Sequence, residues 1–371
     1  MGVLQNPESP TIVLKTDPGS SRCSRCETVP PSVPLEGDLH LWFPLGHSLG
    51  KVARCMRDSS INFEFADNGR SLIAHLAFGE FAMLAGQLDA VMSHEEKLAT
   101  RSLLLPSGEQ PDYQDFGRVT PLGQLIARSS ANWLLEILRE MRLTSHFQSI
   151  VHANDPQRRF AREGLLRGLD RSGALISPFR MYQVARDADL LFQLDLAARR
   201  TVIGELDRHS VTEERTFINF TPTSIYDPVF CLRSTVAAID GAGIPHDHIV
   251  FEVVETERTD SPDHLRNILE FYRAEGFGVA LDDVGSGYSS LNLIHQIQPD
   301  YIKLDMELIR DVDRDPHKAA IAGRLLELAG DLGIQSIAEG VETAAELAWL
   351  QERGATYVQG YLIDRPQPLG Q

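Results

Sequence analysis

Two adjacent carboxylates, Asp282 and Asp283, stand where the short apolar run Gly278 to Leu281 ends. The run is typical of a buried strand, and the glycines and hydroxyls that follow the pair indicate a loop. Like charges side by side at a strand end repel each other, so the arrangement is costly unless a cation neutralises it. The pair therefore suggests a metal site, and a solvated Asp-Asp turn is the alternative that this stretch alone leaves open.

Polar side chains, most of them carboxylates, also stand at the ends of other β-rich runs. Catalytic groups of (β/α) barrels lie at the carboxyl ends of the strands, where the following loops begin. Carboxylates gathered in apolar surroundings carry a large desolvation cost, which metal ions would offset. The residues at these strand ends are Glu163, Leu165 and Arg167, Asn219, Glu252, Asp282 and Asp283, Lys303 and Asp305, Glu339 and Glu342, and Gln359.

The candidate ligands form a hard, oxygen-rich set that contains neither Cys nor His. Such sets suit Mg²⁺ or Mn²⁺ better than Zn²⁺. The six candidate donors are Glu163, Asn219, Glu252, Asp282, Asp283 and Glu339. One octahedral ion that keeps its waters takes fewer ligands than this from protein, whereas two ions that share Asp282 fit the number. Two-metal sites mostly catalyse phosphoryl or ester hydrolysis, and Lys303 is expected to orient an attacking water or to stabilise negative charge on a phosphate.

The elements that position these residues alternate between β-rich runs and helical stretches. Strands roughly 20 to 35 residues apart with helices between them indicate βαβ units and a parallel sheet. About eight such units fit in the last 250 residues or so, which favours a TIM-type barrel over an open sheet. The predicted strands are 217–220, 249–254, 278–281, 301–304, 335–338 and 356–358, with helices such as 262–275 and 318–332 between them.

The first third of the chain has a different composition. Residues 1–36 are rich in Pro, Ser, Gly and Thr and indicate a flexible leader. Residues 37–120 are expected to form a smaller α+β domain of regulatory role, with a strand at 61–65, a helix over 89–105 and a polar linker at 106–120. A helix in which Trp133, Leu134, Ile137, Leu138 and Met141 recur at helical spacing leads into the second domain, residues 121–371.

Composition excludes several classes of protein. The chain of 371 residues has a formal net charge of -17, which argues against a nucleic-acid-binding surface. No stretch approaches the length of apolar sequence that a membrane span needs, and the N-terminus has no basic segment followed by an apolar one, so a cytoplasmic protein is expected. Cys23 and Cys26 have the spacing of half a zinc site, which Cys55 with His40 or His47 could complete; a free thiol pair is the alternative.

Residues from about 143 to 368 resemble an EAL domain, the family of cyclic di-GMP phosphodiesterases. Glu163-Gly164-Leu165-Leu166-Arg167 stands where that family has its name-giving Glu-Ala-Leu. Further motifs occur in the family's order and spacing: Asn219, Glu252 with Glu255, Asp282-Asp283 with Gly285 and Gly287, Lys303 with Asp305, Glu339 with Glu342, and Gln359-Gly360.

The resemblance implies a modified TIM-type barrel with an antiparallel first strand, and hydrolysis of cyclic di-GMP to linear pGpG with two Mg²⁺ or Mn²⁺ ions. It implies catalytic roles for Glu163, Lys303 and Glu339, and a homodimer. One ion would be bound by Glu163, Asn219, Glu252 and Asp282, and the other by Asp282, Asp283 and Glu339; substrate would be bound by Gln148, Leu165, Arg167, Asp305 and Gln359.

Some positions depart from the family pattern, but none of them removes a metal ligand. Losing the ring at positions 168 and 284 is expected to loosen packing and to slow turnover. The departures are Ser149, Gly164, Gly168, Val284 and Ser286, where the family has Pro, Ala, an aromatic residue, Phe and Thr.

Three further residues are expected to support the site by holding its loops, namely Glu255, Ser286 and Glu342, and direct metal ligation is the alternative for Glu255 and Glu342. Glu255 lies three residues after Glu252, so on a regular strand the two point to opposite faces. We therefore expect Glu255 to hold the loop after Asp283. The alternatives to a phosphodiesterase are a cyclic di-GMP receptor without activity and an enolase-like barrel.

Overall fold

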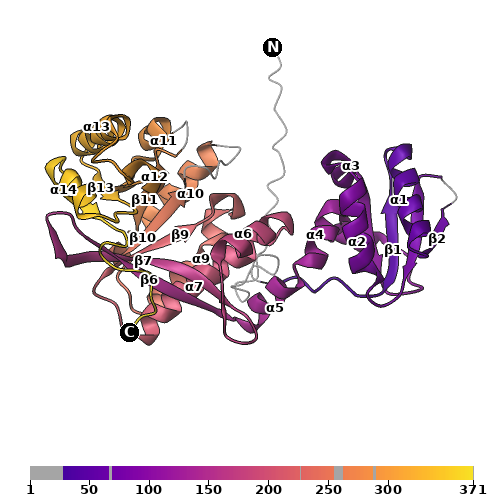
Figure 1. The fold of residues 1–371 in the computed structure, drawn as a ribbon. Coiled ribbons are helices and arrows are strands. Elements are labelled where there is room, and N and C mark those ends of the chain that lie inside the picture. Colours follow the sequence, from indigo (N-terminus) through magenta and orange to yellow (C-terminus); the bar gives the residue numbers. More distant parts are fainter. Residues whose placement is uncertain (1–27, 67–68, 226, 255–261, 287–289, 371) are drawn as a thin grey trace, which may run out of the picture.

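The computed structural model describes residues 28–66, 69–225, 227–254, 262–286 and 290–370. They form two units, each with its own sheet (Figure 1). In Figure 1 the smaller N-terminal unit lies to one side of the barrel, and α4 (Leu122–Ser130) and α5 (Asn132–Glu140) lead from one unit to the other.

The N-terminal unit has a five-stranded antiparallel sheet in the order β2-β3-β1-β4-β5. Along β1 the side chains alternate, so Leu39 and Leu41 enter the core while their neighbours face the other side of the sheet. The smaller α+β domain is confirmed. Its elements are β1 (Gly37–Trp42), α1 (Gly46–Asp58), β2 (Asn62–Phe65), β3 (Ser71–Leu76), α2 (Glu80–Val91), α3 (His94–Ala99), β4 (Arg101–Leu105), η1 (Tyr113–Arg118) and β5 (Thr120–Pro121).

Three local predictions for this part of the chain are wrong. The helix expected over 89–105 ends with α3 at Ala99, and the apolar residues that follow it form β4, because strand pairing in the sheet prevails over local pattern. The expected linker contains η1 and leads into β5, which pairs with β4 in the same sheet. Residues 28–36 are not a free leader, because Val33 is buried in the N-terminal core.

The second sheet has nine strands over the described residues, and eight of them close into a barrel through the pairing of β6 with β7. β6 is antiparallel to both of its neighbours, whereas the pairs from β7 through β14 are parallel, so the TIM-type barrel with an antiparallel first strand is confirmed. The barrel strands are β6 (Leu143–His152), β7 (Asp155–Leu169), β9 (Arg215–Phe220), β10 (Ile249–Val254), β11 (Gly278–Val284), β12 (Tyr301–Leu304), β13 (Gln335–Ala338) and β14 (Tyr357–Val358).

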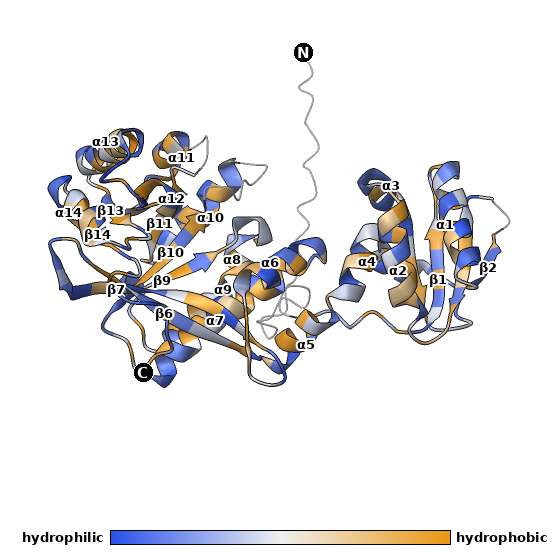
Figure 2. Ribbon diagram, viewed as in Figure 1, coloured by the Kyte–Doolittle hydropathy of each residue, from blue (hydrophilic) through white to orange (hydrophobic). Residues whose placement is uncertain are grey.

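Helices surround the strands and turn their apolar faces toward them. Figure 2 shows apolar residues along β9 and β10 and helices of mixed hydropathy around them, as expected where one helical face is buried. The remaining elements are β8 (Leu175–Ile176), α6 (Pro178–Asp187), α7 (Leu191–Arg208), η2 (Pro222–Ser224), α8 (Pro228–Cys231), α9 (Arg233–Gly241), η3 (His246–His248), α10 (Pro262–Ala274), α11 (Ser290–Ile297), α12 (Met306–Ile309), α13 (Pro316–Leu332) and α14 (Ala344–Glu352).

Helix α4 belongs to both units. Leu122 and Leu125 are part of the N-terminal core, whereas Ala127 packs against the cluster formed with α5, α6 and α7. Hydrogen bonds tie α4 to the end of α6, since Gln124 Nε2 donates to Asp189 Oδ2 at 2.7 Å and Arg128 Nε donates to the carbonyl of Ala188 at 3.0 Å. Among the helices of the described residues, none has the length and apolarity to cross a membrane.

Candidate active site

Two layers of side chains fill the barrel, and each layer takes one residue from every barrel strand. The lower layer is apolar and consists of Ile150, Ala161, Phe217, Val250, Ala280, Tyr301, Ile337 and Tyr357. Residues two apart on a strand share a face, so the next layer toward the open end holds the residues two positions further on, or two earlier on antiparallel β6. That layer is entirely polar and consists of Gln148, Glu163, Asn219, Glu252, Asp282, Lys303, Glu339 and Gln359.

Lys303 lies among four carboxylates of this polar layer and is 1% exposed. Its Nζ is 2.6 Å from Glu339 Oε1 and 2.9 Å from Glu252 Oε1. It is also 3.2 Å from Asp282 Oδ1 and 3.4 Å from Glu163 Oε2. A single buried cation therefore faces four acidic groups, which leaves the layer with an excess of negative charge.

Glu163 is held by neutral donors as well as by Lys303. Asn219 Nδ2 donates to Glu163 Oε1 at 2.9 Å, and Gln359 Nε2 donates to Glu163 Oε2 at 2.8 Å. Burial works to raise the pKa of Glu163, but Lys303 and these hydrogen bonds outweigh it and lower the pKa. This carboxylate is thus ionised across the neutral range.

The pKa values of the other carboxyl groups in the cluster are raised. Burial, with repulsion from neighbouring carboxylates, raises the pKa of Glu339 to about 8 in spite of Lys303. The same causes raise the pKa of Glu252 well above its ordinary value and raise that of Asp282. Burial and the neighbouring Asp282 raise the pKa of Asp283 to about 6. The cluster holds more carboxyl groups than its one lysine can neutralise, as expected for a site that binds cations.

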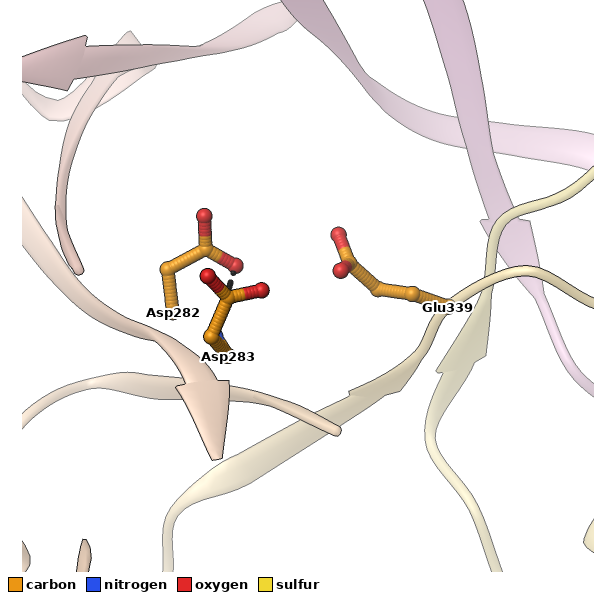
Figure 3. Close-up of side chains that lie close together, drawn as sticks. All are labelled: Asp282, Asp283 and Glu339. Atoms are coloured by element: carbon orange, nitrogen blue, oxygen red, sulfur yellow. Dashed lines mark hydrogen bonds between the residues drawn. The ribbon is translucent and has the colours of Figure 1, made fainter. Parts of the chain in front are cut away.

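Asp282 and Asp283 present their carboxylates to the same end of the barrel although they are neighbours in sequence. Adjacent residues of a regular strand point to opposite faces, but Asp283 has φ of 56° and the register of β11 with β12 shifts between Leu281 and Val284. Figure 3 shows both side chains facing Glu339, which follows β13. Ligand oxygens of these three residues lie within 4.8 Å of one another, and no other such group of acidic, His or Cys residues occurs in the described chain.

This arrangement fits divalent metal ions. Glu252 is fully buried, and neither of its carboxylate oxygens has a hydrogen-bond partner within the described residues, although Lys303 Nζ lies 2.9 Å from Oε1. Because Lys303 is shared with three other carboxylates, it compensates the buried charge of Glu252 only in part, and a further cation would offset the remaining cost. The donor set consists of carboxylates and one amide, which suits Mg²⁺ or Mn²⁺.

The candidate substrate-binding residues lie at the open end of the barrel or just beyond it. Leu165 lines a cavity of about 260 Å³ together with Asn219 and residues of α6. The half-buried guanidinium of Arg167 donates to the carbonyl of Leu166 at 2.8 Å. Asp305 does not continue β12 as expected but caps α12, accepting from the N–H of Glu307 at 2.8 Å.

The three expected supporting residues have different surroundings. Ser286 Oγ donates to the carbonyl of Asp283 at 2.9 Å, which closes the turn after the carboxylate pair. Glu342 forms an ion pair at the surface, with 2.6 Å between its Oε1 and Arg310 Nη2. Glu255 lies outside the described residues.

Sequence reasoning missed Glu346, which does the work expected of Glu342. Its buried carboxylate accepts the N–H groups of Asp311, Glu342 and Thr343 at 2.9 Å each, so it joins the loop after Glu339 to the segment after α12. Thr343 and Glu346 form a capping box at the start of α14. The Thr-x-x-Glu spacing was the available signal.

Asp195 was also missed, and it fixes the loop that follows Asn219. It is fully buried on α7, pairs with Arg199 at 2.9 Å and accepts the N–H of Thr221 at 2.8 Å. Thr235 completes the network by accepting from Arg199 at 3.0 Å. An Asp and Arg four apart on an otherwise apolar helix face are a weak signal, because most such pairs are solvent-exposed.

The expected loss of packing does not occur at Gly168, and Gly164 is tightly packed as well. A Cβ atom at Gly164 would lie 2.7 Å from Val202 Cγ1, and one at Gly168 would lie 2.7 Å from Met181 Sδ. Side chains of α7 and α6 therefore fill the space at these two positions. Val284 is fully buried in the barrel core.

The zinc hypothesis gains no support. Cys55 is a free, half-buried thiol on α1, and it belongs to no group of metal ligands within the described residues. Of its candidate partners, His40 is buried in β1 beside Trp42, and His47 lies 3.1 Å from Glu96. Cys23 and Cys26 lie outside the described residues.

Comparison with known proteins agrees with this geometry. The chain is 32% identical over 218 residues, or 55% of its length, to the probable cyclic di-GMP phosphodiesterase PdeG of Escherichia coli K12, of which the match covers 42%. The c-di-GMP-bound crystal structure of a standalone versatile EAL protein from Vibrio cholerae is 37% identical with a TM-score of 0.55, and the match covers 61% of this chain and 92% of that one.

BlrP1 of Klebsiella pneumoniae, solved as a manganese and cyclic di-GMP complex, has a similar fold over 90% of this chain and 96% of its own, with a TM-score of 0.56 and 22% identity. The chain spans less than half the length of the curated relatives it matches. The family model that describes the EAL domain matches residues 131–366. The chain belongs to the EAL domain family.

Proposed function

We propose that this chain hydrolyses cyclic di-GMP to linear pGpG in a reaction that requires two divalent ions, Mg²⁺ or Mn²⁺. The observation that carries the proposal is the polar layer at the open end of the barrel, in which Lys303 faces four carboxylates and Asp282, Asp283 and Glu339 converge. Every residue that the family pattern requires as a metal ligand is present. The phosphodiesterase names of several curated relatives support the same substrate.

Two groups of residues in this layer would hold the ions. Glu163, Asn219, Glu252 and Asp282 would bind one ion, and Asp282, Asp283 and Glu339 would bind the other. When bound, such ions stabilise charge on the phosphate and activate water. The buried carboxylate of Glu252 and the short separation of the three converging carboxylates support this assignment.

The chain's own residues supply further parts of the chemistry. Lys303 keeps a positive charge at the floor of the site, where it would stabilise negative charge that develops on the phosphate. In the metal-free protein burial and neighbouring carboxylates raise the pKa of Glu339 to about 8, so protons would compete with a metal ion for this carboxylate at neutral pH. Arg167 would bind a substrate phosphate, and Leu165 offers apolar contact beside it.

Incubation of the full chain with cyclic di-GMP and Mn²⁺, followed by chromatography for pGpG, tests the proposal. Glu163→Gln should abolish turnover, because a neutral amide is a poor substitute for an ionised ligand. The exposed Glu270 provides a matched control, since Glu270→Gln makes the same chemical change far from the polar layer. Ca²⁺ should inhibit, because its longer bonds and looser geometry position the reacting groups poorly.

Full activity of Glu163→Gln, or of the wild-type chain in EDTA, would contradict the two-ion mechanism. The second candidate function is a cyclic di-GMP receptor without activity. It would show tight binding of cyclic di-GMP in the presence of Mn²⁺ but no pGpG. The complete set of ligands favours the enzyme.

We also propose that the N-terminal unit regulates the barrel and that the protein is a homodimer. Helix α6 supports regulation, because Asp189, two residues after its end, accepts from Gln124 of α4, and residues of α6 line the cavity beside Asn219. Deletion of residues 1–130 should therefore alter the rate of hydrolysis. If light scattering shows only monomers and the truncated chain matches the full-length rate, both parts of this proposal fail.

A further inference from the structure

The C-terminal segment returns to the first barrel strand beside the polar layer. Phe147 and Gln367 exchange backbone hydrogen bonds of 2.7 and 3.1 Å. The carboxylate of Asp364 accepts the N–H of Ser149 on β6, with distances of 3.1 Å to Oδ1 and 3.3 Å to Oδ2. The main-chain N–H of Ser149 thus holds Asp364 beside β6, the strand that also carries Gln148.

A chain of three hydrogen bonds runs from Asp364 to Glu163. The carbonyl of Asp364 accepts from Gln148 Nε2 at 3.0 Å, and Gln148 Oε1 accepts from Gln359 Nε2 at 3.1 Å. Gln359 Nε2 then donates its second hydrogen to Glu163 Oε2 at 2.8 Å. Gln148, Gln359 and Glu163 are all buried, so the bonds are protected from water.

Both ends of this chain are acceptors, which fixes the orientation of both amides. The Asp364 carbonyl requires the NH₂ group of Gln148, so the Gln148 oxygen faces Gln359. Gln359 must then give both hydrogens away, and its Oε1 is buried without a hydrogen-bond partner in the described chain. If the Asp364 carbonyl moved away, both amides could rotate and turn an oxygen toward the Glu163 carboxylate, which would repel it.

We propose that Asp364 and Ser149 are positioning residues for Glu163. Their hydrogen bond holds the Asp364 carbonyl in place, and this carbonyl orients Gln148 and Gln359 so that Gln359 donates to Glu163. The inference rests on the proposed function for the role of Glu163 as a metal ligand. Partners that orient a metal ligand typically change metal affinity by about 10- to 100-fold when removed.

Calorimetric titration of the full chain with Mn²⁺ tests this role without measuring turnover. Asp364→Ala removes the carboxylate that accepts the Ser149 N–H, and Ser149→Pro removes that N–H. Proline is tolerated at this position because the N–H bonds a side chain and not the neighbouring strand. Each variant should weaken Mn²⁺ binding on the order of tenfold, and the double variant should bind no more weakly than either single one. Asp364→Asn keeps an oxygen acceptor and should retain most of the affinity.

The matched control is Asp300→Ala. Asp300 Oδ2 also accepts a strand N–H, that of Val279 at 2.9 Å, but at the opposite end of the barrel. This variant should lose thermal stability and keep its Mn²⁺ affinity. Comparison with this control distinguishes an effect of lower stability from an effect of a misplaced Glu163 side chain.

Wild-type affinity in both single variants, or additive losses in the double variant, would overturn the inference. So would an equal loss of affinity in Asp300→Ala. Failure of the proposed function would be distinct from these results, because the wild-type chain would then bind Mn²⁺ and respond to Asp364→Ala as expected but release no pGpG.

Discussion

Replacing Lys303 by methionine should destabilise the metal-free protein strongly and the metal-bound protein much less. Methionine keeps most of the side-chain volume but removes the charge that lies within 3.4 Å of four carboxylates. Without that charge, at least one buried carboxylate is left without a counter-ion.

The size of the effect follows from the burial of the cluster. Lys303 and Glu252 are 1% and 0% exposed, and breaking a buried ion pair by removing one partner costs about 3–5 kcal/mol. In a domain of this size 1 kcal/mol corresponds to about 2–4 °C in Tm, so a loss of roughly 6–20 °C is expected in EDTA at pH 8. A divalent ion at 100 times its Kd stabilises either protein by about 2.7 kcal/mol relative to its metal-free form, and the variant gains more where loss of the competing lysine charge strengthens metal binding.

The difference between wild type and variant should depend on pH. The pKa of Glu339 is raised to about 8 and that of Asp283 to about 6. A carboxyl group whose pKa is raised on folding stabilises the fold below its unfolded pKa and loses that contribution as pH rises through the folded value. The carboxylates therefore need Lys303 least at pH 5 and most at pH 8 or above, whereas Lys303 itself stays charged throughout because its own pKa is raised.

Thermal melts at pH 5 and pH 8, in EDTA and in excess Mn²⁺, measure these effects. Lys318→Met is the matched control, because Lys318 Nζ donates to the carbonyls of Glu307 and Arg310 and to no carboxylate of the polar layer. Its effect on Tm should be small and unchanged by Mn²⁺. If Lys303→Met melts at the wild-type temperature in EDTA at pH 8, the reasoning about the buried charge cluster is refuted.

Three further variants test other parts of the structure. Glu346→Gln should lower the free energy of unfolding by about 1–3 kcal/mol at pH 7, measured by urea unfolding. Backbone hydrogen bonds lower the pKa of Glu346 against the effect of burial, so the difference from wild type should shrink as pH falls below about 4.5. Gly164→Ala should cost about 1–3 kcal/mol through overlap with Val202, and Val202→Ala in the same chain should recover part of the loss. Asp195→Ala should leave Arg199 buried without its partner and cost about 3–5 kcal/mol, measured by the same method.

The barrel could be predicted from the sequence because its signals repeat. In each strand from β9 to β14 a polar residue directly follows an apolar run, within the strand or just after it, and helical stretches separate the strands. The pattern held even at β14, which has two residues. Residues two apart on a strand point to the same face, so each polar residue lies one layer above an apolar residue of the barrel interior.

The N-terminal unit was harder to predict because its pairings are not local. Arg101 to Leu105 has no sequence period that separates a strand from a helix, and it becomes β4 because β1 and β5 flank it. Asp305 shows the same limit within the barrel. It ends a strand-like run, but its carboxylate caps α12.

The sequence could not show how Asp282 and Asp283 act together, and this point decides the chemistry of the site. On a regular strand one of the two would face the helices, where an unpaired carboxylate is costly, so the sequence alone does not explain how both carboxylates reach one site. The left-handed backbone at Asp283 and the register shift beside it remove that restriction. Such a conformation is costly for a non-glycine residue and is typically found at functional sites. The strained residue is also the one that gives Glu339 and Asp282 a third carboxylate, so the second ion that we propose would depend on this backbone conformation.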